Sequence, residues 1–121
     1  MATFHGPLEG EALLEAVADA VADLHQRYYH RPPASVKASM MGDDLLACVL
    51  GGVYTDVEKT LIELQRAPIV TSNRSAFQAA MEDSFVAIAE TLTGRRVSQF
   101  ISTHHVGPDL EIELFFLAGR E

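Results

Sequence analysis

The spacing of hydrophobic positions changes along the chain and divides it into helices and strands. From Pro7 to Tyr28, apolar side chains recur every three or four residues, which is typical of one face of an α-helix. This stripe consists of Leu14, Val17, Val21, Leu24 and Tyr28. Acidic residues crowd the first half of the segment and basic residues the end, which complements the helix dipole, and Pro32-Pro33 then ends the helix.

The length of this first helix bears on assembly. A helix from Pro7 to Tyr28 extends about 33 Å at 1.5 Å per residue, whereas a compact domain of this size has a radius of gyration of about 14 Å. The stripe therefore either lies across the domain's own sheet or overhangs it and pairs with a second copy in a homodimer. We expect the first arrangement and keep the homodimer open.

A β-hairpin is predicted next. Val36, Ala38 and Met40 alternate with polar or exposed positions, as in a strand with one buried face. Gly42-Asp43-Asp44 has turn chemistry, and we interpret its aspartates as turn residues and not as metal ligands. The second strand, Leu45–Leu50, is apolar on both faces, which is expected of a central strand covered from two sides. Gly51-Gly52 ends it.

Two helices follow the hairpin. Thr55 and Glu58 have the spacing of a capping box, which begins a short helix that ends at Ala67-Pro68. Residues 68–73 are then predicted as a loop, with Ser72 or Asn73 capping a longer helix that runs to Thr93 and ends at Gly94, a suitable C′ residue. The apolar stripe of this helix is Phe77, Ala80, Met81, Phe85, Ile88 and Leu92.

After Arg95-Arg96 the hydrophobic period changes to two. Val97–Thr103 is predicted as a third strand, residues 104–109 as its turn and Leu110–Ala118 as a fourth strand, with Glu111 and Glu113 facing water. The element order is α-β-β-α-α-β-β, which indicates an α+β fold: a four-stranded, mainly antiparallel sheet with helices packed on one face. We expect a single domain over residues 1–121, with residues 1–6 as a flexible N-terminal end.

Composition narrows the classes of partner. The chain carries 17 acidic and 9 basic residues, a formal net charge of −8, so we expect neither nucleic acid nor direct membrane insertion. No apolar run approaches the roughly 20 residues of a spanning helix. The single cysteine, Cys48, lies in an apolar strand and is interpreted as a buried hydrophobic residue. With no signal peptide at the N-terminus, a cytoplasmic location is expected.

Several motifs together resemble a known bacterial family. Residues 28–36, YYHRPPASV, are similar to a joint of the form Y-x-G-R-G-P-x-S-V, and residues 50–61 to a signature of the form L-x-G-x-L-T-x-x-E-x-T-L. Residues 77–97 resemble the next helix, which ends in T-G-x-x-V, and residues 104–110 resemble a loop and strand start in one branch. The family is the MpsC-like domain family, a component of a sodium-translocating, membrane-potential-generating system. The resemblance covers Ala12 to Leu117.

This resemblance implies a cytosolic accessory role in contact with a membrane transport complex for sodium or bicarbonate movement. It carries no catalytic residues over to this chain, and we assign none. Three positions depart from the family pattern: His30 and Pro33 stand where the joint usually carries glycine and a glycine-proline shifted by one, and Tyr54 replaces the usual leucine.

Three side chains are candidates for ligand binding. Arg31, at the joint between the first helix and first strand, could bind an anion, although capping helix carbonyls or pairing with an acidic neighbour is the favoured interpretation. His104 and His105 are adjacent, so in regular β geometry they point to opposite faces and cannot chelate one metal. We predict no metal and no cofactor; the alternative is a metal site in which Asp109 or His30 supplies a third ligand. Thr55, Glu58, Gly51, Gly52 and Gly94 are interpreted as structural residues.

The sequence is compatible with two functions. The leading hypothesis is a non-enzymatic interaction module, acting as a homodimer, because the sequence shows no catalytic triad, metal-spacing cluster or phosphate loop. The alternative is a small-molecule or anion-binding domain, or a small enzyme, that uses Arg31 and the His104-His105 loop.

Overall fold

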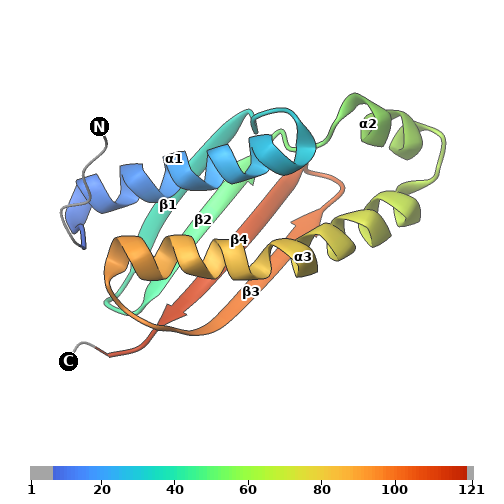
Figure 1. The fold of residues 1–121 in the computed structure, drawn as a ribbon. Coiled ribbons are helices and arrows are strands. Elements are labelled where there is room, and N and C mark those ends of the chain that lie inside the picture. Colours follow the sequence, from blue (N-terminus) through green and yellow to red (C-terminus); the bar gives the residue numbers. More distant parts are fainter. Residues whose placement is uncertain (1–6, 120–121) are drawn as a thin grey trace.

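A computed structural model describes residues 7–119 and shows a sheet with helices packed against it (Figure 1). The elements, in chain order, are α1 (Gly10–Tyr29), β1 (Ser35–Met41), β2 (Leu45–Gly51), α2 (Asp56–Glu63), α3 (Ala67–Thr93), β3 (Val97–His105) and β4 (Leu110–Leu117). The order α-β-β-α-α-β-β and the α+β class are confirmed. The flexible end predicted for residues 1–6 lies outside the described residues.

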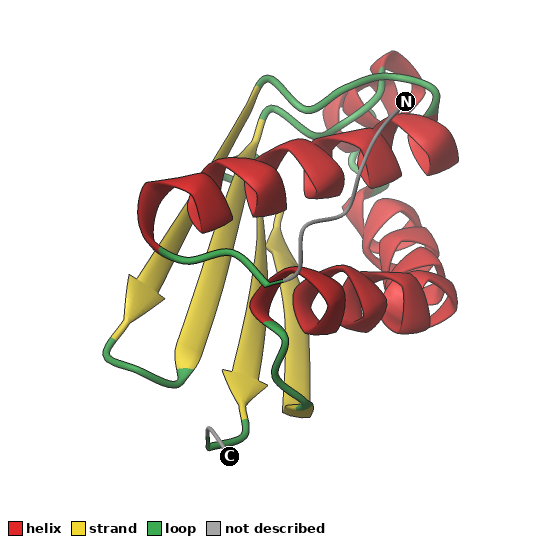
Figure 2. Cartoon of the chain, turned by 60° about the vertical axis from the view of Figure 1, so that its left-hand side comes forward, coloured by secondary structure: helices red, strands yellow, loops and turns green. Residues whose placement is uncertain are grey.

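The sheet has the strand order β1-β2-β4-β3, and each neighbouring pair is antiparallel. The two hairpins, β1-β2 and β3-β4, therefore join side by side through β2 and β4, which become the central strands. Helices α1 and α3 cross the same face of the sheet, and α2 lies at one end (Figure 2). Among the described residues, no helix covers the opposite face.

The apolar stripe of α1 packs inside the domain. Leu13, Val17, Val21 and Leu24 are buried, with Leu13 taking the place predicted for Leu14. The stripe thus lies against the chain's own sheet and α3, so it forms no seam for a partner helix. The helix begins at Gly10 and not at Pro7, because Gly10 has a positive φ of 60° that a helix cannot continue through.

The predicted loop at residues 68–73 is wrong. Helix α2 ends at Glu63, and Gln65, with a φ of 62°, turns the chain. Ala67-Pro68 begins α3 instead of ending α2, since proline suits the first helical turn, where its missing N–H costs nothing. Ser72 and Asn73 consequently lie within α3 and do not cap it. The buried side of α3 is Val70, Arg74, Met81, Phe85 and Ala89, and the predicted stripe residue Ala80 is exposed.

The orientation predicted for β4 is also wrong. Glu111 and Glu113 do not face water: with Phe115 and Leu117 they point toward the helices and are buried. Leu110, Ile112, Leu114 and Phe116 point to the uncovered side and are half-buried. The alternation of β4 was predicted correctly, but the assignment of its two faces was reversed.

Strand β2 is central, as predicted, but it is covered on one face only. Leu46, Cys48 and Leu50 point toward the helices and are fully buried, whereas Val49 on the other face is 37% exposed. Burial raises the pKa of the Cys48 thiol to about 12, so this thiol stays protonated and behaves as a small apolar group. Within residues 7–119, neither long helix has the apolar character needed to cross a bilayer.

Two glycines allow the sheet to pass into α2. A Cβ on Gly51 would lie 2.8 Å from the Oγ of Ser35, and one on Gly52 would lie 2.5 Å from the Cβ of Ala34. Gly52 also has a φ of 61°, in the left-handed region. Both glycines lie where the end of β2 passes directly against the start of β1, and Gly52 is the glycine of the motif at residues 50–61.

Replacing Gly52 tests this close approach, and Gly42 provides a matched control. Gly42 has a φ of 69° but open space around its Cβ position, so Gly42→Ala measures backbone strain alone, about 1–2 kcal/mol. Gly52→Ala adds overlap with Ala34 and should lose a further 1–3 kcal/mol, roughly, in urea unfolding. Equal losses in the two variants would show that the contact with Ala34 is not limiting.

Candidate functional site

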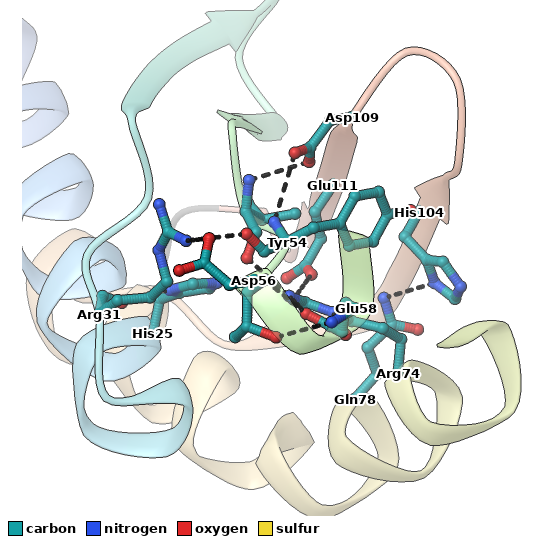
Figure 3. A network of polar contacts seen from close by, with 12 residues as sticks. His25, Arg31, Tyr54, Asp56, Glu58, Arg74, Gln78, His104, Asp109 and Glu111 are labelled. Atoms are coloured by element: carbon teal, nitrogen blue, oxygen red, sulfur yellow. Dashed lines mark hydrogen bonds and ion pairs between the residues drawn. The ribbon is translucent and has the colours of Figure 1, made fainter. Parts of the chain in front are cut away.

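Arg74 lies at the centre of a buried polar cluster where β2 leads into α2 (Figure 3). Its Nε donates to Oε2 of Glu58 at 2.7 Å, and its Nη2 donates to Oε1 of the same carboxylate at 2.6 Å. Nη2 also donates to the carbonyl of Val53 at 2.6 Å, and Nη1 donates to Glu111 at 3.3 Å. One guanidinium thus joins α3 to α2, to the β2–α2 connection and to β4.

The capping box positions Glu58 for this contact. The backbone N–H of Thr55 donates to Oε1 of Glu58 at 2.8 Å, and the N–H of Glu58 donates to Oγ1 of Thr55 at 3.2 Å. Burial opposes the ionisation of Glu58, but the hydrogen bonds from Arg74 and Thr55 outweigh it and lower the pKa of this carboxyl. The Glu58 carboxylate therefore both caps α2 and neutralises Arg74, and its Oε1 takes part in both contacts.

Tyr54 and Asp109 complete the connection between the two hairpins. Asp109 accepts from the N–H of Val53 at 2.9 Å and from the N–H of Tyr54 at 3.3 Å. The hydroxyl of Tyr54 donates to the carbonyl of His105 at the end of β3. Asp109, which we considered as a third metal ligand, thus binds backbone N–H groups.

Arg31 packs into the same region from the other side. Its Nη1 donates to the carbonyl of Tyr54 at 3.0 Å and lies 3.9 Å from a carboxylate oxygen of Asp56, while its own carbonyl accepts from Nδ1 of His25 at 2.9 Å. These contacts connect the α1–β1 joint to the start of α2. The preceding residue, His30, has a φ of 61°, in the left-handed region that favours glycine.

The two histidines lie on opposite faces of β3. The strand continues to His105, so the turn predicted from residue 104 begins after it. Nδ1 of His104 accepts from the side-chain amide of Gln78 on α3 at 3.1 Å, whereas His105 is paired with Leu110 on the uncovered face. Among the described residues, no group of three or more His, Cys, Asp or Glu side chains could hold a metal ion.

Aromatic rings surround the guanidinium. The Cζ of Arg74 lies 3.9 Å from the ring centroid of Tyr29, and the His25 ring packs against Tyr29 at a tilt of 34°, with 4.6 Å between the ring centroids. Burial lowers the pKa of His25 and of His104, so both imidazoles are neutral near pH 7. Nε2 of His25, the hydroxyl of Tyr29 and Nε2 of His104 are buried and lack a hydrogen-bond partner among the described residues.

Glu113 is the least compensated buried charge-bearing group in this part of the chain. Its carboxyl is fully buried, and its hydrogen-bond partner is the hydroxyl of Ser102, which lies 2.9 Å from Oε2. Burial, helped by the nearby Glu111, raises the pKa of Glu113 to about 9. Burial also raises the pKa of Glu111, although Arg74 opposes it. Glu113 therefore stays protonated at neutral pH.

A hollow of about 950 Å³ lies at the opposite end of the sheet, between the start of α1, the β1–β2 turn and the end of α3. Arg95 lies in its wall, but the guanidinium donates to the carbonyls of Asp43 and Ala118. This arginine ties the two chain segments together. Gly94, the predicted C′ residue, has a left-handed φ of 69° and packs against Pro7.

The uncovered side of the sheet presents a broad apolar surface, which we call the open sheet face. Its centre is formed by the outward residues of β2 and β4, all of them apolar: Leu45, Ala47, Val49, Gly51, Leu110, Ile112, Leu114 and Phe116. Its edges are the outward residues of β1 and β3: Ser35, Lys37, Ser39, Met41, Gln99, Ile101, Thr103 and His105. Met41 is 58% and Ile101 is 40% exposed.

The sequence interpretation missed both the polar cluster and the open sheet face. Arg74 lies four residues after Val70 and seven before Met81, so it continues the buried stripe of α3. A predicted helix that begins at Ala67 would therefore have placed the Arg74 side chain on the buried face of α3. Both faces of β4 contain apolar residues, so the prediction that Glu111 and Glu113 face water rests on their acidity alone.

Removing the central cation should destabilise the fold strongly. In Arg74→Met, Glu58 and Glu111 lose their buried partner, and we expect a loss of about 3 kcal/mol or more in urea unfolding. Adding Glu111→Gln to this variant should restore part of the loss, because it removes a buried carboxyl that no longer faces a cation. Arg96→Ala is the control, since Arg96 is exposed and should change stability by about 0.5 kcal/mol or less. A loss of that small size in Arg74→Met would contradict the central role of Arg74.

Glu113 should make stability fall as pH rises. Its folded pKa of about 9 lies above the ordinary value of 4.5, so its contribution is complete below pH 4.5 and decreases up to about pH 9. Glu113→Gln lacks this titration, so its stability relative to the unchanged chain should improve by up to about 1.4 kcal/mol per pH unit in this window. Urea unfolding between pH 5 and 9 measures the difference, with the exposed Glu82→Gln as control. A difference that does not change with pH would show that Glu113 titrates normally.

The comparisons with known proteins agree with the motifs. A family model described as "Na+-translocating membrane potential-generating system (MpsC)" matches residues 10–119. Searches of curated proteins and of solved structures found no match. The matched segment includes every helix and strand of the described fold, together with the Gly51-Gly52 junction, the capping box and Arg74. The chain belongs to the MpsC family.

Proposed function

We propose that the chain is a non-enzymatic accessory module of a Na+-translocating, membrane-potential-generating system, and that it acts in the cytoplasm by protein contact through the open sheet face. The observation that carries this proposal is the apolar centre of that face, which no described helix covers. Contiguous apolar surfaces of this kind mark sites of protein interaction, because exposing them to water is unfavourable.

The polar groups of the chain favour a function in protein contact over an enzymatic function. Arg74, Glu58 and Asp109 are satisfied by other protein groups and hold elements together. Cys48, with its raised pKa, is buried away from them in the apolar core. Arg31 and His104 also have protein partners, in Tyr54 and Gln78. These side chains therefore act as parts of the scaffold that displays the open sheet face.

Substitutions at two valines test the proposal. Val49 lies at the centre of the open sheet face, whereas Val57, on α2, is 71% exposed away from the sheet. In cells that lack the chain, Val49→Asp should fail to restore sodium-dependent membrane potential, because a carboxylate at the centre of an apolar contact is costly to desolvate. Val57→Asp should restore it fully. The potential is followed with a voltage-sensitive dye at matched protein levels.

The opposite result would overturn the proposal. Restoration by Val49→Asp, with the variant shown to be folded by circular dichroism, means that the open sheet face is not the working surface. If the unchanged chain does not alter the potential at all, then the accessory role itself is wrong.

A further inference from the structure

We infer that the open sheet face is occupied by a second copy of this chain, so that two sheets pack face to face in a homodimer. This inference deepens the proposed function and rests on its choice of working surface. It replaces a helix-mediated dimer, since the α1 stripe is buried within the domain.

The arrangement of side chains on the face is that of an interface between proteins. The apolar residues occupy the two central strands, and serine, lysine, glutamine, threonine and histidine occupy the two edge strands. Specific interfaces have the same anatomy, with an apolar centre that excludes water and a polar rim that remains hydrated. Exposed Met41 and Ile101 extend the apolar area toward both edges.

Charge favours a second copy over a partner of different chemistry. The chain has a net charge of −8, yet the outward strand positions include no aspartate or glutamate. Lys37 carries the one permanent charge among them, and it lies on the edge strand β1. A charged partner would find almost nothing to pair with, whereas an identical face offers an uncharged apolar surface without repulsion.

The area of the face is sufficient for a stable dimer. Four strands spaced about 4.8 Å apart and seven residues long cover roughly 19 by 23 Å. With side-chain relief, such a contact buries roughly 600–700 Å² on each copy, or about 1,200–1,400 Å² in total, which reaches the lower part of the range for specific complexes. The face therefore accommodates a dimer without any additional segment.

Two-fold symmetry places the central strands over one another. Whether the axis runs along the strands or across them, β2 and β4 of one copy lie over β2 and β4 of the other, about 10 Å away. Lys37 remains at the rim in either arrangement. The product has four layers, with the two sheets inside and α1 and α3 on both outer sides.

Sedimentation equilibrium on the purified chain tests the inference. We expect the mass of two chains at tens of micromolar and the mass of one chain for Val49→Asp, while Val57→Asp stays dimeric. Because an aspartate in a central strand could also weaken folding, two milder variants are included. Val49→Thr keeps the shape of the side chain and should weaken the dimer by about tenfold or more, since two hydroxyls are buried per dimer. Ile101→Lys lies on an edge strand and should weaken it in the same direction.

Other outcomes would overturn the inference. A wild-type chain of single mass contradicts it directly, and a dimer that survives Val49→Asp and Ile101→Lys must use another surface. Binding of the wild-type chain to neutral phosphatidylcholine vesicles, lost in Val49→Asp, would identify lipid as the occupant instead.

The experiments distinguish a failure of the homodimer from a failure of the proposed function. A monomeric wild-type chain whose Val49→Asp variant cannot restore membrane potential excludes the second copy but leaves the open sheet face as the working surface. A dimeric chain that loses its dimer in Val49→Asp, but still restores the potential, keeps the inference and excludes the proposed function.

Discussion

The neutralisation of Arg74 is the constraint on which the fold depends. A buried guanidinium is tolerated only when carboxylates and carbonyls surround it, and this chain supplies them from α2, the β2–α2 connection and β4. Features of the motif at residues 50–61 position the partners that come from α2 and from the β2–α2 connection. Gly52 allows the chain to turn, Thr55 caps α2, and the cap orients Glu58 toward the cation. Four distant parts of the sequence are thereby held in one arrangement.

This arrangement gives the sheet an unusual distribution of polarity. The side covered by helices contains Arg74, Glu111, Glu113 and His104, while the side open to water is lined by aliphatic and aromatic residues at its centre. A helix-covered core normally collects the apolar residues and leaves the polar ones outside. In the proposed dimer the outer side of β4 is covered as well, so both faces of this strand are removed from water.

Sequence reasoning predicted the parts of the fold that depend on local chemistry. The alternation in β1, the capping box at Thr55 and the helix end at Gly94 follow from a few neighbouring residues, and they are present in the structure. The failures involve choices that local patterns leave open. Proline at residue 68 suits a helix start as well as a loop. Both faces of β4 carry apolar side chains, so only packing against the helices decides which face of the strand is buried. The burial of Arg74 depends on partners 16 and 37 residues away, which no local spacing reveals.

The buried Glu113 carboxyl has a consequence for the folding reaction itself. At neutral pH this group is ionised in the unfolded chain and protonated in the folded one, because its folded pKa is about 9. Each chain therefore takes up a proton from the solvent as it folds, and the heat of unfolding depends on the ionisation enthalpy of the buffer. The folded population is therefore sensitive to the alkalinity of its surroundings.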